Sequence, residues 1–220
     1  EFIMSKLYVF GIGGTGSRVI KSLVMLASAG VKINQDIVPI IIDPDFSNQN
    51  LTNTLECLKK YNRIHGKLTD ADTRKNQFFR TKFIDVLGNG YRLELDDTRD
   101  KTFEEYIGYN TMQRENQAIA SILFSRENLA SDMAVGFKGN PNVGSIVLNQ
   151  FADSYAFTQF AQSFNQGDRI FIISSIFGGT GASGFPLLLK NLRDFGEDRP
   201  NSKLIRTAPI GAITVLPYFN

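Results

Sequence analysis

Two glycine-rich segments of the sequence have the residue types that bind phosphate. The first is Gly11-Ile12-Gly13-Gly14-Thr15-Gly16-Ser17, which follows an apolar run and opens a helical pattern. Glycines let the backbone turn sharply and approach a phosphate, whose charge then meets the unpaired N–H groups at the start of the helix. The same residues could form a plain strand-to-helix turn, but the strand before them and the helix after them favour nucleotide binding.

The second segment, Phe177–Pro186, has glycine or another small residue at most positions and follows another apolar run. Its free N–H groups could form an anion-binding nest that leads into a helix. The glycine spacing is similar to that of a Walker A loop, but Phe185-Pro186 stands where Lys and Ser or Thr are required, so a P-loop is excluded. We expect the Thr180 hydroxyl to donate to a phosphate oxygen. A bulky residue at Gly179 or Gly181 is expected to block binding without unfolding the sheet.

An acidic segment, Asp43-Pro44-Asp45-Phe46-Ser47-Asn48, comes directly after a third apolar run. In a dinucleotide-binding fold, an acid at this position binds a ribose hydroxyl. Asp43 and Asp45 could instead contact Mg²⁺ through water, because this ion gives up its hydration shell reluctantly. A third interpretation is equally open, in which Asp45 or Ser47 caps the next helix.

The fourth segment, Gly136–Gly144, contains the pair Asn140-Pro141 and precedes a helical pattern. Asn142 or Gly144 could cap that helix, so the segment alone fits a turn as well as a binding loop. The four segments together supply the predicted nucleotide-binding residues. These are Gly11, Gly13, Gly14, Thr15, Gly16, Asp43, Asp45, Gly139, Asn140, Gly178, Gly179, Thr180 and Gly181.

Strands and helices must position these segments. Nearly continuous Ile, Val and Phe in several short runs is typical of strands buried on both faces of a parallel sheet. The alternation of strand, turn and helix predicts an α/β fold with a doubly wound, mainly parallel sheet, helices on both faces and ligand at the carboxyl ends of the strands. The expected strands are Leu7–Phe10, Val38–Ile42, Asp132–Val135 (the weakest), Ile170–Ser174 and Ile210–Leu216. The expected helices are Ser17–Ser28, Ser145–Phe164 and Ala182–Phe195.

Charge is concentrated in residues 55–130, which hold thirteen Lys or Arg and twelve Asp or Glu residues. We interpret this region as a mostly helical, solvent-exposed insertion outside the nucleotide pocket, either a solvated face or a partner-binding surface. The chain is otherwise interpreted as a single nucleotide-binding domain over 1–220. Residues 1–3 are expected to be a vector remnant before an initiator at Met4.

Composition excludes several classes of protein. The net charge of +2 gives no reason to expect nucleic-acid binding. Cys57 and His65 are the only cysteine and histidine, which excludes an internal disulfide and a Cys/His zinc cluster and fits a reducing, cytoplasmic setting. The uncharged run Ile170–Leu189 is long enough to span a bilayer, but glycine, serine and proline interrupt it, so we expect no membrane span.

The order of these segments resembles the tubulin/FtsZ superfamily, which includes tubulin and its bacterial cell-division relatives. Gly178-Gly179-Thr180-Gly181, with Gly184 and Pro186 after it, is similar to the superfamily's signature loop. The other matching segments are Gly11–Ser17 (the first phosphate loop), Asp43-Pro44-Asp45 (the acid after the second strand), Gly136–Gly144 (the loop near the terminal phosphate) and Ala212–Phe219 (the next strand and its Pro-Phe turn). The match looks closest to the poorly characterised bacterial tubulin-like proteins.

The resemblance implies GTP or GDP with Mg²⁺ as cofactors, and nucleotide-dependent self-association of the full-length protein into an assembly such as a filament. The chain departs from the division proteins at Arg18, where they usually carry Asn. In the family, the base-contacting helix and the acidic loop that activates water in the neighbouring subunit come after the position matching Asn220. The family's C-terminal domain is therefore expected to be absent, and this chain is expected to bind nucleotide with little or no turnover.

Three other classes fit parts of the sequence. Gly11–Ser17 followed by Asp43–Asn50 is similar to ATP-dependent adenylating enzymes of the ubiquitin-activating superfamily, but Leu51 or Thr52 stands where a catalytic Arg is expected and the paired Cys-x-x-Cys motifs are missing. A dinucleotide-binding oxidoreductase is supported only by the first loop and Asp43. A nucleotide-gated scaffold overlaps the tubulin-like interpretation and differs only in whether turnover occurs.

Overall fold

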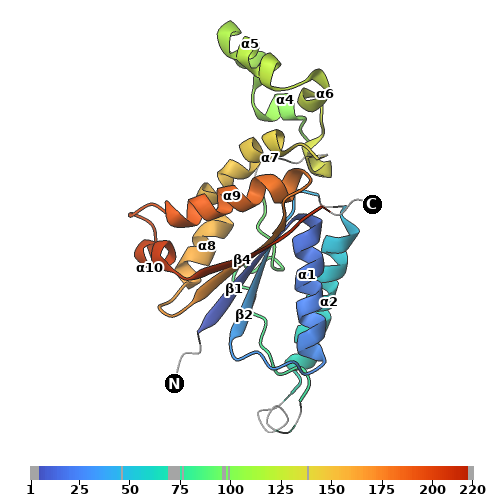
Figure 1. Cartoon of the computed structure of the whole chain (residues 1–220), viewed down its shortest axis with the longest axis vertical. Coiled ribbons are helices and arrows are strands. Elements are labelled where there is room, and N and C mark those ends of the chain that lie inside the picture. The colour runs from blue at the N-terminus through green and yellow to red at the C-terminus, as the bar shows by residue number, and fades with distance from the viewer. Residues whose placement is uncertain are drawn as a thin grey trace.

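Figure 1 shows the chain as a computed structural model in which residues 5–45, 47–68, 75, 77–95, 98, 100–137 and 139–217 are described. The expected vector remnant at residues 1–3 lies outside the described residues. In chain order, the elements are β1 (Lys6–Ile12), α1 (Gly13–Ser28), β2 (Asp36–Ile42), α2 (Gln49–His65), α4 (Phe103–Tyr106), η1 (Tyr109–Thr111), α5 (Arg114–Leu123), α6 (Arg126–Leu129), η2 (Met133–Val135), α7 (Pro141–Leu148), η3 (Asn149–Asp153), α8 (Tyr155–Ser163), β3 (Arg169–Ser175), α9 (Gly179–Arg193), α10 (Ser202–Thr207) and β4 (Ile210–Val215).

The four strands form one parallel sheet in the order β2-β1-β3-β4. Pairing places Leu7 opposite Ile37 on one side and opposite Arg169 on the other. Every β2 residue from Ile37 to Ile42 is buried, as expected for a strand covered on both faces. The predicted α/β class and its parallel sheet are therefore confirmed.

The strand predicted over Asp132–Val135 is wrong, because Met133–Val135 forms a short 3-10 helix. The Asp132 side chain accepts a hydrogen bond from the Ala134 N–H at 2.8 Å, which favours a turn over a strand. Gly136 then ends this short helix with a φ of 74°, which favours glycine. Asp132 keeps only an isolated antiparallel bridge to Thr102.

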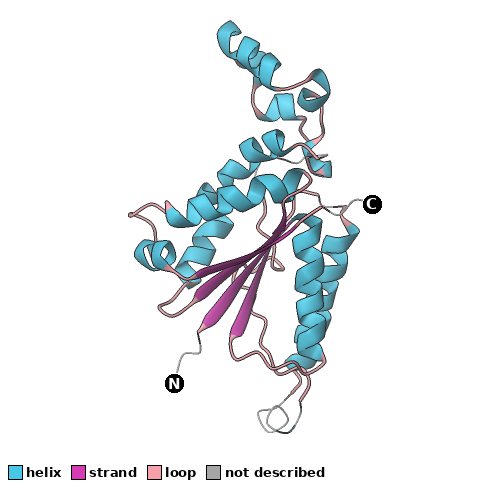
Figure 2. Ribbon diagram, in the orientation of Figure 1, coloured by secondary structure: helices cyan, strands magenta, loops and turns pink. Residues whose placement is uncertain are grey.

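Helices cover both faces of the sheet, as Figure 2 shows. On one face, Ile20 and Val24 of α1 and Leu58 of α2 pack with Val9 and Ile41 of the sheet. The opposite face is covered by α7, α8 and α9. No helix in the described part of the chain is both long and apolar enough to cross a bilayer.

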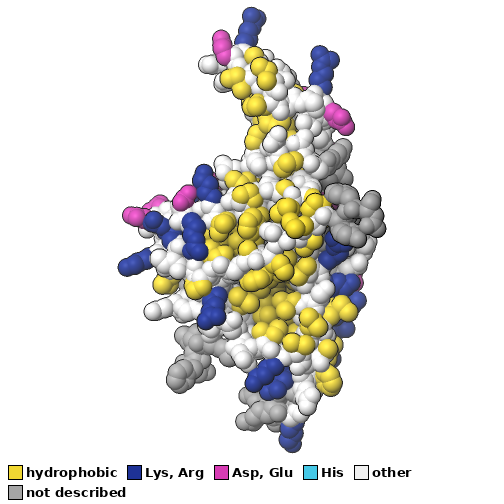
Figure 3. Space-filling view, viewed as in Figure 1, with side chains coloured by type: hydrophobic (Ala, Val, Ile, Leu, Met, Phe, Trp, Pro, Cys, Tyr) yellow, Lys and Arg dark blue, Asp and Glu magenta, His cyan; other side chains and the backbone are white. Residues whose placement is uncertain are grey.

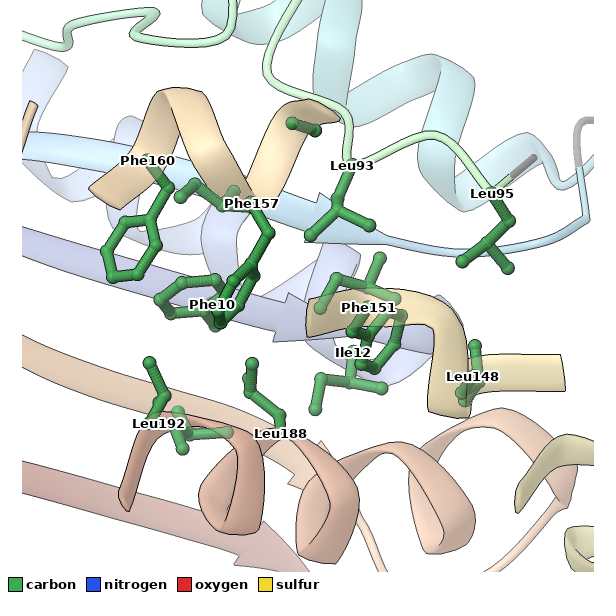
Figure 4. Close-up of a cluster of buried hydrophobic side chains, with 14 of the residues drawn as sticks. Phe10, Ile12, Leu93, Leu95, Leu148, Phe151, Phe157, Phe160, Leu188 and Leu192 are labelled. Atoms are coloured by element: carbon green, nitrogen blue, oxygen red, sulfur yellow. The ribbon is translucent and has the colours of Figure 1, made fainter. Parts of the chain in front are cut away.

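Phenylalanine and leucine side chains fill the face under α8 and α9, as Figure 4 shows. Phe10 of β1 meets Phe160 of α8 edge-to-face, with ring centroids 5.2 Å apart. Phe157 lies 5.2 Å from Phe160 on the same helix. Leu188 and Leu192 of α9 complete the cluster, and both are fully buried. Burial of these large apolar surfaces is the main force that holds the helices on the sheet.

The single helix predicted over Ser145–Phe164 is wrong. The structure begins α7 earlier, at Pro141, which suits the first helical position because proline has no N–H to leave unpaired there. A 3-10 turn over Asn149–Asp153 then separates α7 from α8. Ser154 starts the second helix by accepting a hydrogen bond from the Phe157 N–H at 3.2 Å.

The charged region, residues 55–130, is divided between the sheet and a projection. Its first residues belong to α2, where Leu58 and Tyr61 are buried against the sheet, so the prediction of a solvent-exposed insertion is wrong for this part. Residues 82–93 run along the edge of β2, where Ile41 N donates to Tyr91 O at 2.8 Å. Only the later part, with α4, α5 and α6, projects from the body of the molecule (Figure 1).

Candidate functional site

The glycine segments meet because of the strand order. The chain leaves β1 through α1 to reach β2 on one side, and later enters β3 on the other side of β1. In an open parallel sheet, ligands bind outside the carboxyl ends of the strands at such a reversal of direction. The segments that follow β1 and β3 therefore lie next to each other, although they come from opposite ends of the chain.

The first glycine segment is the last part of β1 and the first turn of α1. The helix begins at Gly13, earlier than the predicted Ser17, and Gly13 has a φ of 66° that favours glycine. A Cβ on Gly16 would overlap the carbonyl carbon of Gly11 and lie 3.0 Å from the Ile173 oxygen. Gly11 and Gly16 are therefore needed for packing of α1 on the sheet. The first-turn N–H groups of Gly13 and Gly14 have no hydrogen-bond partner within α1.

The second glycine segment starts α9 at Gly179 instead of the predicted Ala182. Gly178 precedes the helix with a φ of 83°, and a Cβ placed there would meet no atom within 4 Å. A Cβ on Gly181 would lie 2.5 Å from Ser175 Oγ. The expectation that a bulky residue at Gly181 leaves the sheet undisturbed is therefore wrong, because the helix start is packed against the end of β3.

The two segments contact each other through Gly13 and Thr180. A Cβ on Gly13 would lie 3.5 Å from the Thr180 Cβ and 3.8 Å from the Gly181 nitrogen. The third segment joins them, because a Cβ on Gly179 would lie 3.2 Å from the Asn140 nitrogen. Gly139 is exposed and has a φ of 77°. The structure thus brings together the three glycine segments that were predicted to share a ligand.

Asp43 and Asp45 lie in this cluster but have different surroundings. Asp43 is buried and accepts hydrogen bonds from Asp45 N at 3.1 Å and from Asn48 Nδ2 at 2.8 Å. Burial disfavours its charged form and raises the pKa of this carboxyl from 3.8 to about 6, against the opposing effect of the two hydrogen bonds. Asp45 Oδ1 accepts from the N–H and hydroxyl of Ser47, and a Cβ on Gly136 would lie 3.6 Å from the Asp45 Cβ.

Two asparagines were missed as members of the site. Asn48 caps α2 by accepting a hydrogen bond from Asn50 N at 2.9 Å, so neither Asp45 nor Ser47 has the predicted capping role. A Cβ on Gly14 would lie 3.1 Å from Asn48 Nδ2 and 3.5 Å from Asn50 Nδ2. The only sequence signal was the position of Asn48, at the end of the acidic segment and directly before a helical pattern.

The positive ends of four helices converge here. The helices α1, α2, α7 and α9 all begin at the cluster, and none has an acidic residue in its first turn. Each N-terminus carries about half a positive charge and unpaired N–H groups. Exposed Arg18 adds a full charge next to Thr15, whose Oγ1 lies 3.5 Å from Arg18 Nη2. The arrangement suits an anion with several negative charges.

The described residues include an arginine-lined pocket but no cluster of metal ligands. Among the described residues, no group of three or more His, Cys, Asp or Glu side chains is placed to hold a metal ion. A pocket of about 560 Å³ lies at the opposite end of α9. There, Arg206 pairs with Glu197 at 3.1 Å, and Arg193 donates to the carbonyl oxygens of Arg206 and Ala208. These arginines already have partners, so the glycine cluster remains the candidate site.

Comparison of the sequence with protein-family models and with curated proteins finds no match.

Proposed function

We propose that this chain binds a guanine nucleotide, with its phosphate groups held where the N-termini of α1, α2, α7 and α9 converge. The convergence of four helix starts, free of first-turn acids, is the observation that carries the proposal. A helix N-terminus binds anions through its unpaired N–H groups and its dipole. A diphosphate or triphosphate has enough charge and length to contact several of these helix ends at once.

The proposal gives the predicted residues different roles. The N–H groups of Gly13 and Gly14 bind phosphate on the α1 side, and those of Gly179 and Gly181 bind it on the α9 side. Thr180 adds a hydroxyl donor next to Gly13. Thr15, Gly139, Asn140 and Gly178 line the open edge, with Gly139 and Asn140 near the terminal phosphate, whereas Gly11 and Gly16 keep the backbone close enough for α1 to begin at this point.

Asp43 and Asp45 are proposed to contact Mg²⁺ through water molecules. The two carboxylates are close, since the Asp45 N–H donates to Asp43 Oδ1. Buried Asp43 ionises more readily when a cation is near it, because opposite charge favours the charged form. Mg²⁺ commonly keeps several water ligands and uses phosphate oxygens for the rest, which suits a site with few carboxylates.

The choice of guanine, and a role in nucleotide-dependent assembly, rest on the resemblance to the tubulin superfamily. Preference for ATP would instead favour an adenylating enzyme. We propose that the loops bind nucleotide with little turnover. Backbone N–H groups that bind the ground state and the transition state equally do not speed the chemical step.

Isothermal titration calorimetry with GTP, GDP and ATP, with and without Mg²⁺, tests the proposal on the wild-type chain. Thr180→Val removes the hydroxyl and keeps the shape of the side chain. A hydrogen bond to a charged group contributes about 1.5 kcal/mol or more, so we expect GTP affinity to fall about tenfold. Thr207→Val is the matched control, because Thr207 bonds Lys203 O at 2.8 Å on α10, away from the loops.

The outcomes separate the claims. A folded wild-type chain that binds none of the three nucleotides would refute the proposed function. Unchanged affinity in folded Thr180→Val would remove Thr180 from the phosphate site. An equal loss of affinity in Thr207→Val would mean that the Thr180 effect is not local.

A further inference from the structure

An uncharged helical strip projects from the molecule on α5. Ile122 is 84% exposed, Leu123 61% and Ile119 56%. The ten residues from Asn116 to Ser125 include no charged side chain. Figure 3 shows yellow apolar atoms on this projection, at the top of the view. Isolated exposed apolar residues are ordinary, but a contiguous group on a projecting element marks an interaction surface.

The strip borders an apolar groove of about 490 Å³. Tyr106 and Met112 line one part of the groove, and Ile119 and Leu123 of α5 line another. Ile146 of α7 is also in the lining and is 40% exposed. The molecule therefore presents both a ridge of apolar side chains and an apolar groove beside it. A helix face can dock in such a groove.

The charges at the two ends of the strip are balanced in the same way. The tripeptide Arg-Glu-Asn occurs at residues 114–116, where α5 begins, and again at 126–128, just after α5 ends. Arg114, Glu115, Arg126 and Glu127 are all exposed. None of the four forms an ion pair with another described residue. Glu115 precedes Ile119 by four positions and lies on the strip's face of α5, whereas Arg114 lies about 100° away around the helix. Glu115 at one end of the strip and Arg126 at the other are opposite in charge.

We infer that this surface binds a second copy of the chain around a twofold axis, with the two α5 helices antiparallel. A twofold contact uses the same patch on both partners, so the patch must complement itself. In this arrangement, Glu115 of one copy lies opposite Arg126 of the other. A strongly acidic or basic partner would leave one of these two charges facing a like charge, whereas a second copy pairs both.

The short length of α5 limits the affinity of the proposed dimer. A ten-residue helix is about 15 Å long, shorter than the side of a standard-size interface. Part of the contact must therefore come from the groove residues beside α5. We expect a reversible dimer, with a dissociation constant on the order of micromolar. The dimer requires no nucleotide and is independent of the proposed phosphate site.

Sedimentation velocity of the wild-type chain, from about 1 to about 300 μM and without nucleotide, tests the inference across the expected range of affinity. Ile122→Glu places a charge in the middle of the strip and should weaken the dimer at least tenfold. Because Ile122 is mostly exposed, the variant should fold normally. Met25→Glu is the matched control: Met25 is 56% exposed on α1, and the dimer should be unchanged.

A charge cycle tests the antiparallel arrangement itself. Glu115→Arg places this residue opposite Arg126 of the second copy, so the dimer should weaken in a salt-dependent way. Adding Arg126→Glu to the same chain should restore the dimer, because the opposed charges are again unlike. A wild-type chain that stays monomeric at 300 μM, or a dimer that Ile122→Glu leaves intact, would overturn the inference. A double variant whose dimer is no stronger than that of Glu115→Arg would exclude the antiparallel arrangement.

Discussion

Asn48 joins Asp43 to the start of α2. Its Nδ2 donates to Asp43 Oδ2 at 2.8 Å, and its Oδ1 accepts from Asn50 N at 2.9 Å. One side chain thus holds the buried acid and caps the helix whose N-terminus faces Gly14. The two contacts use the two ends of the amide, so no other residue type of this size can make both with the same geometry.

We expect Asn48→Ala to lower the free energy of unfolding by about 1–2 kcal/mol, because it removes a helix cap and a partner of a buried carboxyl. Asn48→Ser keeps a capping oxygen but loses the donor to Asp43, so its loss should be smaller. Urea denaturation at pH 7 measures both variants. Equal losses in the two variants would mean that the cap contributes little and that the bond to Asp43 dominates.

Asp43 should make stability depend on pH. Burial raises the pKa of this carboxyl from 3.8 to about 6 in the folded chain. Between pH 4 and pH 6, the folded chain holds a proton that the unfolded chain has released, so the free energy of unfolding decreases as pH rises through this range. A pKa raised by this much lowers the free energy of unfolding above pH 6 by an amount on the order of 3 kcal/mol.

The test compares wild type with Asp43→Asn, which carries no titrating group at this position. The stability difference, defined as the free energy of unfolding of wild type minus that of the variant, should decrease as the pH rises from 4 to 7. The side-chain carboxyl signal that is lost in the variant should titrate near pH 6 by carbon NMR. A stability difference that stays constant across the range would contradict the raised pKa.

Gly181→Ala should destabilise the chain as well as affect binding. The added Cβ would lie 2.5 Å from Ser175 Oγ and 2.7 Å from Ser175 O, and overpacking of this kind costs about 1–3 kcal/mol. Gly139→Ala tests backbone strain without crowding: its φ is 77°, and its Cβ would meet no atom within 4 Å. Gly139→Ala is expected to lower the free energy of unfolding by about 1 kcal/mol. A lower free energy of unfolding for Gly139→Ala than for Gly181→Ala, measured by denaturation, would contradict this ranking.

Asp168→Ala should lower the free energy of unfolding by roughly 3 kcal/mol, because it removes the partner of a largely buried cation. Asp168 is buried, accepts from Lys6 N at 2.7 Å and Asn165 N at 2.9 Å, and lies 3.5 Å from Lys6 Nζ. Asp153→Ala is the control: its carboxylate is 78% exposed and pairs with Arg199, so the loss should be within about 1 kcal/mol. Both are measured by urea denaturation.

Asp168 lies at the amino end of β3, at the opposite end of the sheet from the glycine cluster. Nucleotide affinity of the folded Asp168→Ala chain should therefore equal that of wild type. A loss of affinity under conditions in which the variant is fully folded would show that the two ends of the sheet are coupled.

Sequence patterns predicted the sheet and the meeting of the glycine segments well. Runs such as Val38–Ile42 are apolar at every position except one proline, which is typical of a buried parallel strand. Because the carboxyl ends of parallel strands share one edge, segments that follow such strands must be neighbours. The starts of α1 and α9 were placed too late, because glycine is a poor helix former in general but costs little in a first turn.

The errors have a common cause in tertiary contacts. Ser145–Phe164 keeps a helical spacing of apolar residues across the break at Asn149–Asp153, since both helices face the same core. Asn48 has its role in the site only because Asp43 is buried beside it. The pairing of 82–93 with β2 involves two isolated bridges, too few to impose a regular alternation on the sequence.

The pairing of β1 with β3 also decides when the glycine cluster can form. Leu7 pairs with Arg169, so the two main glycine segments meet only through a contact between distant parts of the chain. During synthesis, β1, α1, β2 and α2 emerge first, but the glycine cluster stays incomplete until α9 has left the ribosome. Long-range closure of this kind slows folding. The proposed nucleotide is therefore expected to stabilise the completed fold by mass action and not to template its early steps.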